Sequence, residues 1–150
     1  MKLRAMLVLT SLLVVGAIAA GCGSSGNDTT STSSITKAEF IAKADAICQQ
    51  GNQEINKAGQ QQFQGQGKPT QAQFNQFATQ TIIPGVQKQV DQIKALGAPS
   101  GDEAQVNQIL TTVQADIDKV KADPSLVQGN AFADGNKLAQ DYGLKVCGKG

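Results

Sequence analysis

Apolar residues recur at steps of three and four in four separate stretches of the chain, and this spacing restricts the fold more than any other feature. Such steps bring side chains onto one face of a helix, and no stretch shows the sustained alternation of a β-strand. A chain of 150 residues is long enough for one domain. We therefore predict an all-α domain over residues 35–150, folded as an antiparallel four-helix bundle.

Capping boxes mark the predicted helix starts. In this motif two side chains three residues apart bond each other's backbone N–H groups. It occurs three times, at Thr36–Glu39, Thr70–Gln73 and Ser100–Glu103. We expect the first helix to stop at Gly59, before a loop rich in Gln and Gly, and the last helix to stop at Gly143.

Pro84 lies inside the second predicted helix. Proline lacks an N–H group and crowds the preceding turn, so we predict that this helix is kinked or broken near Ile82. One interpretation is a helix bent to follow the bundle. The other is a splayed end that opens an apolar pocket, whose predicted lining residues are Phe74, Phe77, Ile82 and Val86.

The N-terminus has the pattern of a secretory signal, with basic residues in 1–4 and an apolar run over 5–20. Its end, Ala19-Ala20-Gly21-Cys22, resembles a bacterial lipobox, although leucine usually stands where Ala19 does. We predict a lipoprotein signal peptide over residues 1–21, lipidated Cys22, and a flexible Ser/Thr/Gly tether over 22–34. The alternative is conventional cleavage after Ala19, which would leave Cys22 as a free thiol.

Three cysteines are present, so lipidation of Cys22 would leave Cys48 and Cys147 as an even pair. In an exported chain two cysteines on a small domain commonly form a disulfide, which we predict here. A redox-active pair or a metal site is the alternative. The chain has no CxxC spacing and no histidine to favour either.

The two ends of the predicted domain resemble a group of small secreted or lipid-anchored actinobacterial proteins. That group has an "ADxIC" helix, matched here by residues 44–48, and a C-terminal "YGLxxCG" motif, matched by residues 142–148. The resemblance implies a helical envelope protein closed by one disulfide. It implies no activity, and it carries over no functional residues.

Composition excludes most catalytic schemes. Histidine is absent, Arg4 is the only arginine, and there is no GxSxG or phosphate-binding loop. A net charge of +1 does not favour a nucleic-acid partner.

We predict neither cofactor nor metal. We interpret the protein as a non-catalytic interaction or structural module of the cell envelope, lipid-anchored on the outer face of the cytoplasmic membrane. The alternative is a binding protein for a small apolar or lipid-like ligand in the bundle. An enzyme using carboxylates or lysines is a third, weaker hypothesis.

Overall fold

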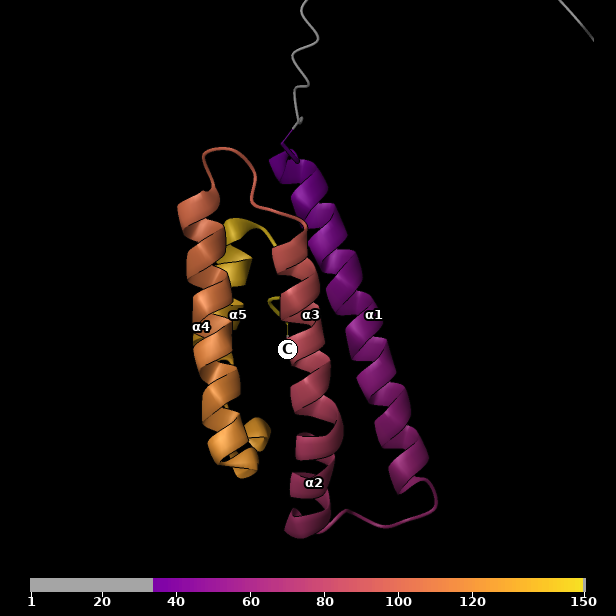
Figure 1. The fold of residues 1–150 in the computed structure, drawn as a ribbon. Helices are drawn as coiled ribbons and strands as arrows, with labels where there is room; N and C mark the ends of the chain where they lie inside the picture. Colours follow the sequence, from indigo (N-terminus) through magenta and orange to yellow (C-terminus); the bar gives the residue numbers. More distant parts are fainter. Residues whose placement is uncertain (1–33, 150) are drawn as a thin grey trace, which may run out of the picture. The chain divides into compact units, whose positions relative to one another are not determined.

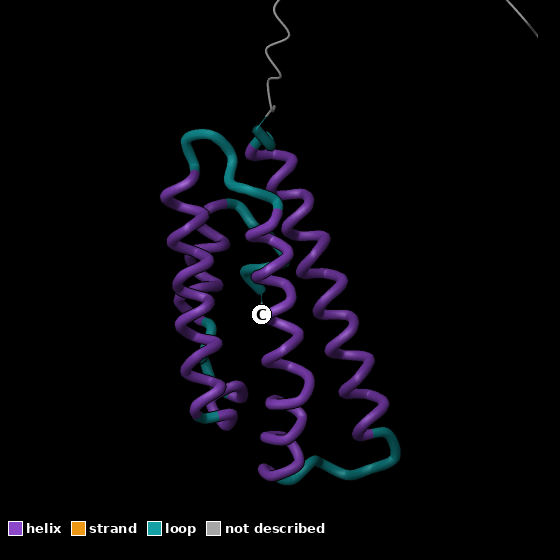
Figure 2. Tube along the Cα trace, in the orientation of Figure 1, coloured by secondary structure: helices purple, strands orange, loops and turns teal. Residues whose placement is uncertain are grey.

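The computed structural model describes residues 34–149, and all regular elements in this range are helical (Figures 1 and 2). The α-helices are α1 (Lys37–Phe63), α2 (Gln71–Phe77), α3 (Ile83–Ala95), α4 (Glu103–Ala122) and α5 (Ala133–Tyr142). A π-helical segment, η1 (Ala78–Ile82), joins α2 to α3 without a loop, and a 3-10 segment, η2 (Pro124–Gln128), precedes α5. Counting α2–η1–α3 as one run, four helices form a bundle, and the predicted all-α class is confirmed.

Several predictions from the N-terminus lie outside the described residues. These are the signal peptide over residues 1–21, the lipidated Cys22, and all of the tether over 22–34 except Ser34. Within residues 34–149 no helix is both long enough and apolar enough to cross a bilayer.

The first two capping boxes are confirmed. At the start of α1, the Glu39 N–H donates to Thr36 Oγ1 over 3.2 Å, and the Thr36 N–H donates to Glu39 Oε2 over 3.0 Å. At the start of α2, the Gln73 N–H donates to Thr70 Oγ1 over 3.3 Å, and the Thr70 N–H donates to Gln73 Oε1 over 2.9 Å. Local sequence therefore sets both helix starts.

The third predicted capping box is wrong. Helix α4 begins two residues later than this box predicts, with Asp102 as its N-cap residue and no side-chain cap. The Asp102 carboxylate accepts instead from the Tyr142 hydroxyl at 2.8 Å and forms an ion pair with Lys37 at 3.4 Å. The Lys37 ammonium also lies 4.1 Å from the centre of the Tyr142 ring. A tertiary contact among α1, α4 and α5 thus replaces the local cap.

The predicted stop at Gly59 is also wrong, because α1 continues to Phe63. A methyl group at Gly59 would lie 3.2 Å from Cζ of Phe77. The ring of Phe63 packs edge-on against Phe77 with centroids 5.4 Å apart. Gly59 therefore allows the close approach of a neighbouring helix rather than ending its own.

Pro84 does not split the second helix. The Ile83 N–H donates to the Ala78 carbonyl, five residues back, so the turn before Pro84 holds one extra residue. That residue rotates the rest of the helix, and the buried position becomes Ile83, 5% exposed, while Ile82 is only half-buried. The wider turn lies directly before Pro84, which has no N–H group to donate.

Buried apolar side chains form two clusters. The first joins α1, the end of α3, α4 and α5 with the C-terminal tail, around Phe40, Ala44, Val106 and Tyr142. The second joins α3 and α4 around Ile83, Val90, Ile117 and Val120. Residues of η2 and the segment before α5, including Phe132, pack against the second cluster.

The C-terminal tail is held against α1 by two interactions that we call the C-terminal clasp. Cys48 and Cys147 form the predicted disulfide, which links positions 99 residues apart. The Asp45 carboxylate accepts three backbone N–H groups of the tail, from Lys145 at 2.9 Å, Val146 at 2.8 Å and Cys147 at 3.2 Å. Leu144, 3% exposed, adds apolar burial at the same place. The clasp explains physically why an Asp and a Cys stand three residues apart in α1.

Replacing both Cys48 and Cys147 by alanine should lower the free energy of unfolding by about 2–5 kcal/mol, because the unfolded chain regains the freedom of a long loop. Urea denaturation of the variant and of the oxidised wild type measures the difference. Equal midpoints and slopes for the two proteins would contradict the prediction.

Tyr142 should titrate well above pH 10, because burial and the hydrogen bond to the Asp102 carboxylate raise the pKa of its hydroxyl. The unfolded chain loses this proton near pH 10, so this contribution to stability is present below pH 10 and is lost as pH rises above it. Tyr142 is the single tyrosine and tryptophan is absent, so near-UV phenolate absorbance reports this group alone. Asp102→Asn should move the midpoint down toward 10. A midpoint near 10 in wild-type protein that remains folded by circular dichroism would refute the assignment.

Candidate functional site: a cavity in the bundle core

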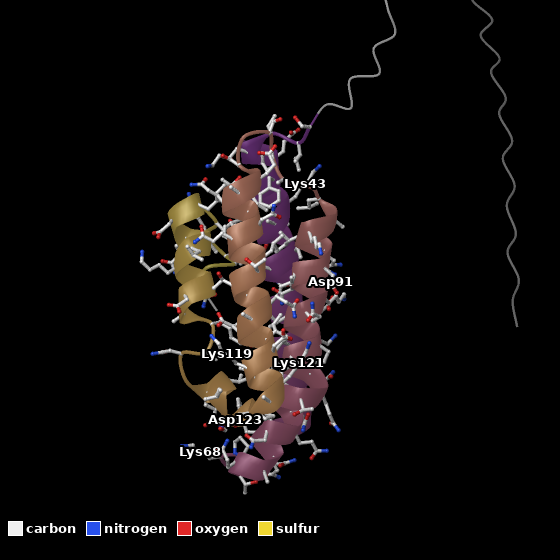
Figure 3. All side chains as sticks on the ribbon, turned by 60° about the vertical axis from the view of Figure 1, so that its left-hand side comes forward. Lys43, Lys68, Asp91, Lys119, Lys121 and Asp123 are labelled. Carbon is white, nitrogen blue, oxygen red and sulfur yellow. A yellow bond between two sulfur atoms is a disulfide. The ribbon has the colours of Figure 1, made fainter. Side chains whose placement is uncertain are left out.

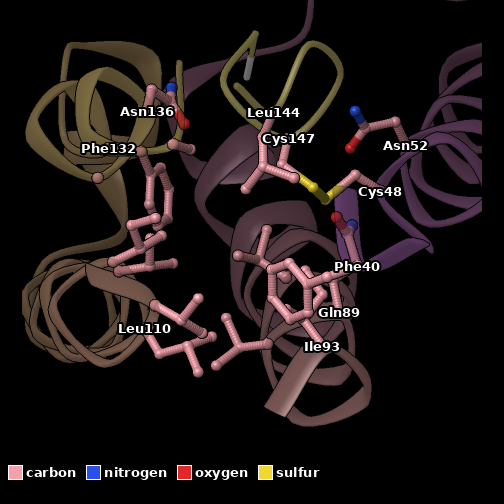
Figure 4. Close-up of a pocket in the computed structure, with 17 residues that line it drawn as sticks. Phe40, Cys48, Asn52, Gln89, Ile93, Leu110, Phe132, Asn136, Leu144 and Cys147 are labelled. Carbon is pink, nitrogen blue, oxygen red and sulfur yellow. A yellow bond between two sulfur atoms is a disulfide. The ribbon is translucent and has the colours of Figure 1, made fainter. Parts of the chain in front are cut away.

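A partly open cavity of about 120 Å³ lies in the bundle where the two apolar clusters meet. Figure 4 shows side chains from several helices and the C-terminal tail arranged around it. Its apolar wall comes from all four helices, the segment before α5 and the tail, and includes Phe40, Val86, Val90, Ile93, Val106, Ile109, Leu110, Val113, Phe132, Ala139 and Leu144. Natural cores hold few voids larger than a water molecule, so a space of this size is a candidate ligand site.

Small residues on α5 account for part of this space. Gly135 and Ala139, one helical turn apart, both line the cavity and are both buried. A methyl group at Gly135 would lie only 2.6 Å from Cγ2 of Val113 on α4. The glycine lets the backbones of α4 and α5 approach closely, but neither residue fills the interior with a side chain.

The clasp forms another part of the wall. Cys48, Cys147 and Leu144 line the cavity, with the disulfide lying directly between α1 and the tail (Figure 4). The bond that closes the fold therefore also bounds the site.

Among the described residues, three polar side chains line the cavity: Gln89 on α3, Asn52 on α1 and Asn136 on α5. Gln89 is only 7% exposed, and its Nε2 atom has no hydrogen-bond partner. Asn52 and Asn136 are partly exposed. None of the described lining residues carries a charge, and the two cysteines are consumed by the disulfide. Chemically, the site suits an uncharged, mostly apolar molecule.

Of the four residues predicted to line a pocket, only Val86 lines this cavity. Phe77 is buried against Phe63, whereas Phe74 and Ile82 are half-buried elsewhere. Ile82 does not reach the cavity because the extra residue in η1 turns it away from the buried face. Sequence analysis did not predict that Gln89 lines a cavity. The residue that could have indicated it is Gly51, a glycine in the apolar stripe of the first helix, because Gly51 faces Gln89.

Charged side chains lie along the outside of the bundle, as Figure 3 shows for Lys43, Asp91 and Lys121 at different levels. Asp116 is the exception: it is 2% exposed, accepts from Lys119 at 2.9 Å, and leaves its Oδ2 atom without a partner. Asp118, two residues on, is exposed and points elsewhere. Residues 34–149 contain no group of three side chains placed to hold a metal ion.

Comparisons with known proteins place this chain in no established class. No protein-family model, curated protein or solved structure matches it. A function for this chain is therefore inferred from the cavity and not from a related protein.

Gly135→Ala should lower the free energy of unfolding by about 1–3 kcal/mol, because the new methyl group forces Val113 or α5 to move in a packed core. Gly67→Ala is the matched control, since a methyl group there meets no atom within 4 Å. Urea denaturation compares the two variants. Equal stabilities would show that α4 and α5 do not pack as closely as described.

Proposed function

We propose that this protein is a lipid-anchored, non-catalytic protein of the bacterial cell envelope whose helical domain binds a small, mainly apolar ligand. The observation that carries the proposal is the cavity of about 120 Å³ in the bundle core. It moves the binding hypothesis ahead of the interaction or structural module favoured by the sequence.

The size of the cavity supports a ligand. An engineered apolar cavity of about 150 Å³ in another protein binds benzene. Unfilled space in a core lowers stability, because the side chains around it lose packing contacts. A bound molecule would restore the lost contacts, and it would stabilise the folded state further by mass action.

The surface offers less support for an interaction module. Leu126, 43% exposed, is the only large hydrophobic side chain exposed in the described part of the chain. Protein-binding surfaces are commonly marked by contiguous apolar patches, and a single leucine does not make one. The module remains the alternative outcome of the experiment below.

The membrane is the proposed partner of the N-terminus, through a lipid on Cys22. The lipobox-like residues, the odd number of cysteines and the observed pairing of Cys48 with Cys147 support this assignment. The resemblance to actinobacterial envelope proteins agrees with it. The lipid would hold the domain at the outer face of the cytoplasmic membrane.

The proposal includes an antiparallel arrangement of the helices and a bend at η1. Short connections over residues 64–70 and 96–102 support reversal of direction between successive helices. The wide turn before Pro84 supports the bend, because π-type turns and prolines are common causes of helix kinks.

Native mass spectrometry of the full-length protein, extracted gently from its own membranes, tests the proposal. We expect a lipidated chain with one disulfide and a reproducible bound small molecule. Ala139→Leu should abolish the extra mass, because the larger side chain fills the cavity. Ala115→Leu, at an exposed position of α4, should leave it unchanged.

A second measurement detects binding even if the natural ligand is lost during extraction. Benzene should shift the methyl NMR signals of cavity residues such as Val90 and Ile109 in the wild-type protein, and should not do so in Ala139→Leu. Protein that carries no bound mass and shows no such shifts would overturn ligand binding and favour the interaction module. An unlipidated chain would overturn the membrane anchor.

A further inference from the structure

We infer that Gln89 makes the cavity selective for uncharged ligands that carry a hydrogen-bond acceptor oxygen, such as a carbonyl or ether. The inference rests on the proposed function, and it specifies the class of ligand bound. It follows from the position of the one buried amide group among the described residues of a mainly apolar wall.

Gln89 is the only buried polar side chain among the residues that line the cavity. At 7% exposure, its Nε2 atom is removed from solvent and has no partner in the protein. Buried polar groups are nearly always hydrogen-bonded, so an exception calls for an explanation. An acceptor atom on a ligand would supply the missing partner.

Gly51 on α1 makes room for the amide. A methyl group at position 51 would lie 2.3 Å from Gln89 Nε2 and 2.5 Å from its Cδ. The side chain of Gln89 therefore lies directly against the backbone of α1. Figure 4 shows the amide on the side of the cavity formed by Cys48 and Asn52.

Water is a poor substitute for this partner. A buried water usually makes about three hydrogen bonds. Gln89 is the one buried polar side chain among the described lining residues, and Asn52 and Asn136 are partly exposed. A charged ligand is also disfavoured, because no lysine or carboxylate among the described residues lines the cavity to compensate a buried charge. A neutral molecule with one oxygen on an apolar frame satisfies both conditions.

A pair of probes with nearly the same shape tests the inference. Cyclopentanone carries an acceptor oxygen, and methylenecyclopentane replaces that oxygen with a methylene group. Both are close to benzene in size. Affinities for the full-length protein are measured by titration of the cavity methyl signals, and the ratio of the two affinities is compared between proteins so that differences in hydrophobicity cancel.

Variants distinguish the contribution of the Gln89 amide from that of the residues around it. Gln89→Met keeps the size of the side chain and removes the donor, and Gly51→Ala keeps the donor and displaces it. Each should lower the preference for cyclopentanone over methylenecyclopentane by about three- to tenfold, the range of one hydrogen bond. Gln92→Met, at an exposed position of the same helix, should leave the ratio unchanged.

A direct readout needs no variant. In wild-type protein, cyclopentanone should shift the side-chain amide NMR signal of Gln89, and methylenecyclopentane should shift it much less. If both probes bind and the ratio is the same in all four proteins, the inference is overturned and ligand binding stands. If neither probe binds to any of them, the cavity is not a binding site and the proposed function fails as well.

Discussion

The C-terminal clasp is the constraint on which the rest of this domain depends. It joins α1, the first helix, to the tail that follows α5, so all the other helices lie in the loop that it closes. The disulfide reduces the conformational freedom of the unfolded chain. Asp45 fixes the direction of the tail by accepting hydrogen bonds from three successive N–H groups. Gly143, at φ +113°, provides the left-handed turn that sends the tail back toward α1.

This arrangement couples stability to the site. Cys48 and Cys147 of the clasp line the cavity, and so does Leu144 beside them. The first apolar cluster packs around them, so the walls there are fixed without the cavity being filled. A small domain closed in this way can tolerate a void that would cost an unlinked bundle a larger share of its stability.

Local signals predicted the helices well, and tertiary contacts account for the errors. The boxes at Thr36 and Thr70 act within one turn of helix, so sequence was sufficient there. The box predicted at Ser100 did not form, because α4 starts after Asp102, whose carboxylate accepts from the Tyr142 hydroxyl, 40 residues away. Gly59 and Gly51 face neighbouring helices, and neither ends α1. Of the four predicted pocket residues, the structure places only Val86 at the cavity, because several helices together determine which space stays unfilled.

Gln89 shows what a pattern of polar and apolar residues can and cannot reveal. Residues 87–89 are all polar, but helical geometry places position 89 one turn before Ile93, beside the inward stripe of Val86, Val90 and Ile93. The pattern alone predicts that the Gln89 amide is exposed to solvent at the edge of this stripe. Gly51 changes that conclusion, because a glycine within a buried stripe leaves room for a side chain from the facing helix, and a long polar one can occupy it. A buried donor then remains without an acceptor, and the cavity is the place where one can be supplied.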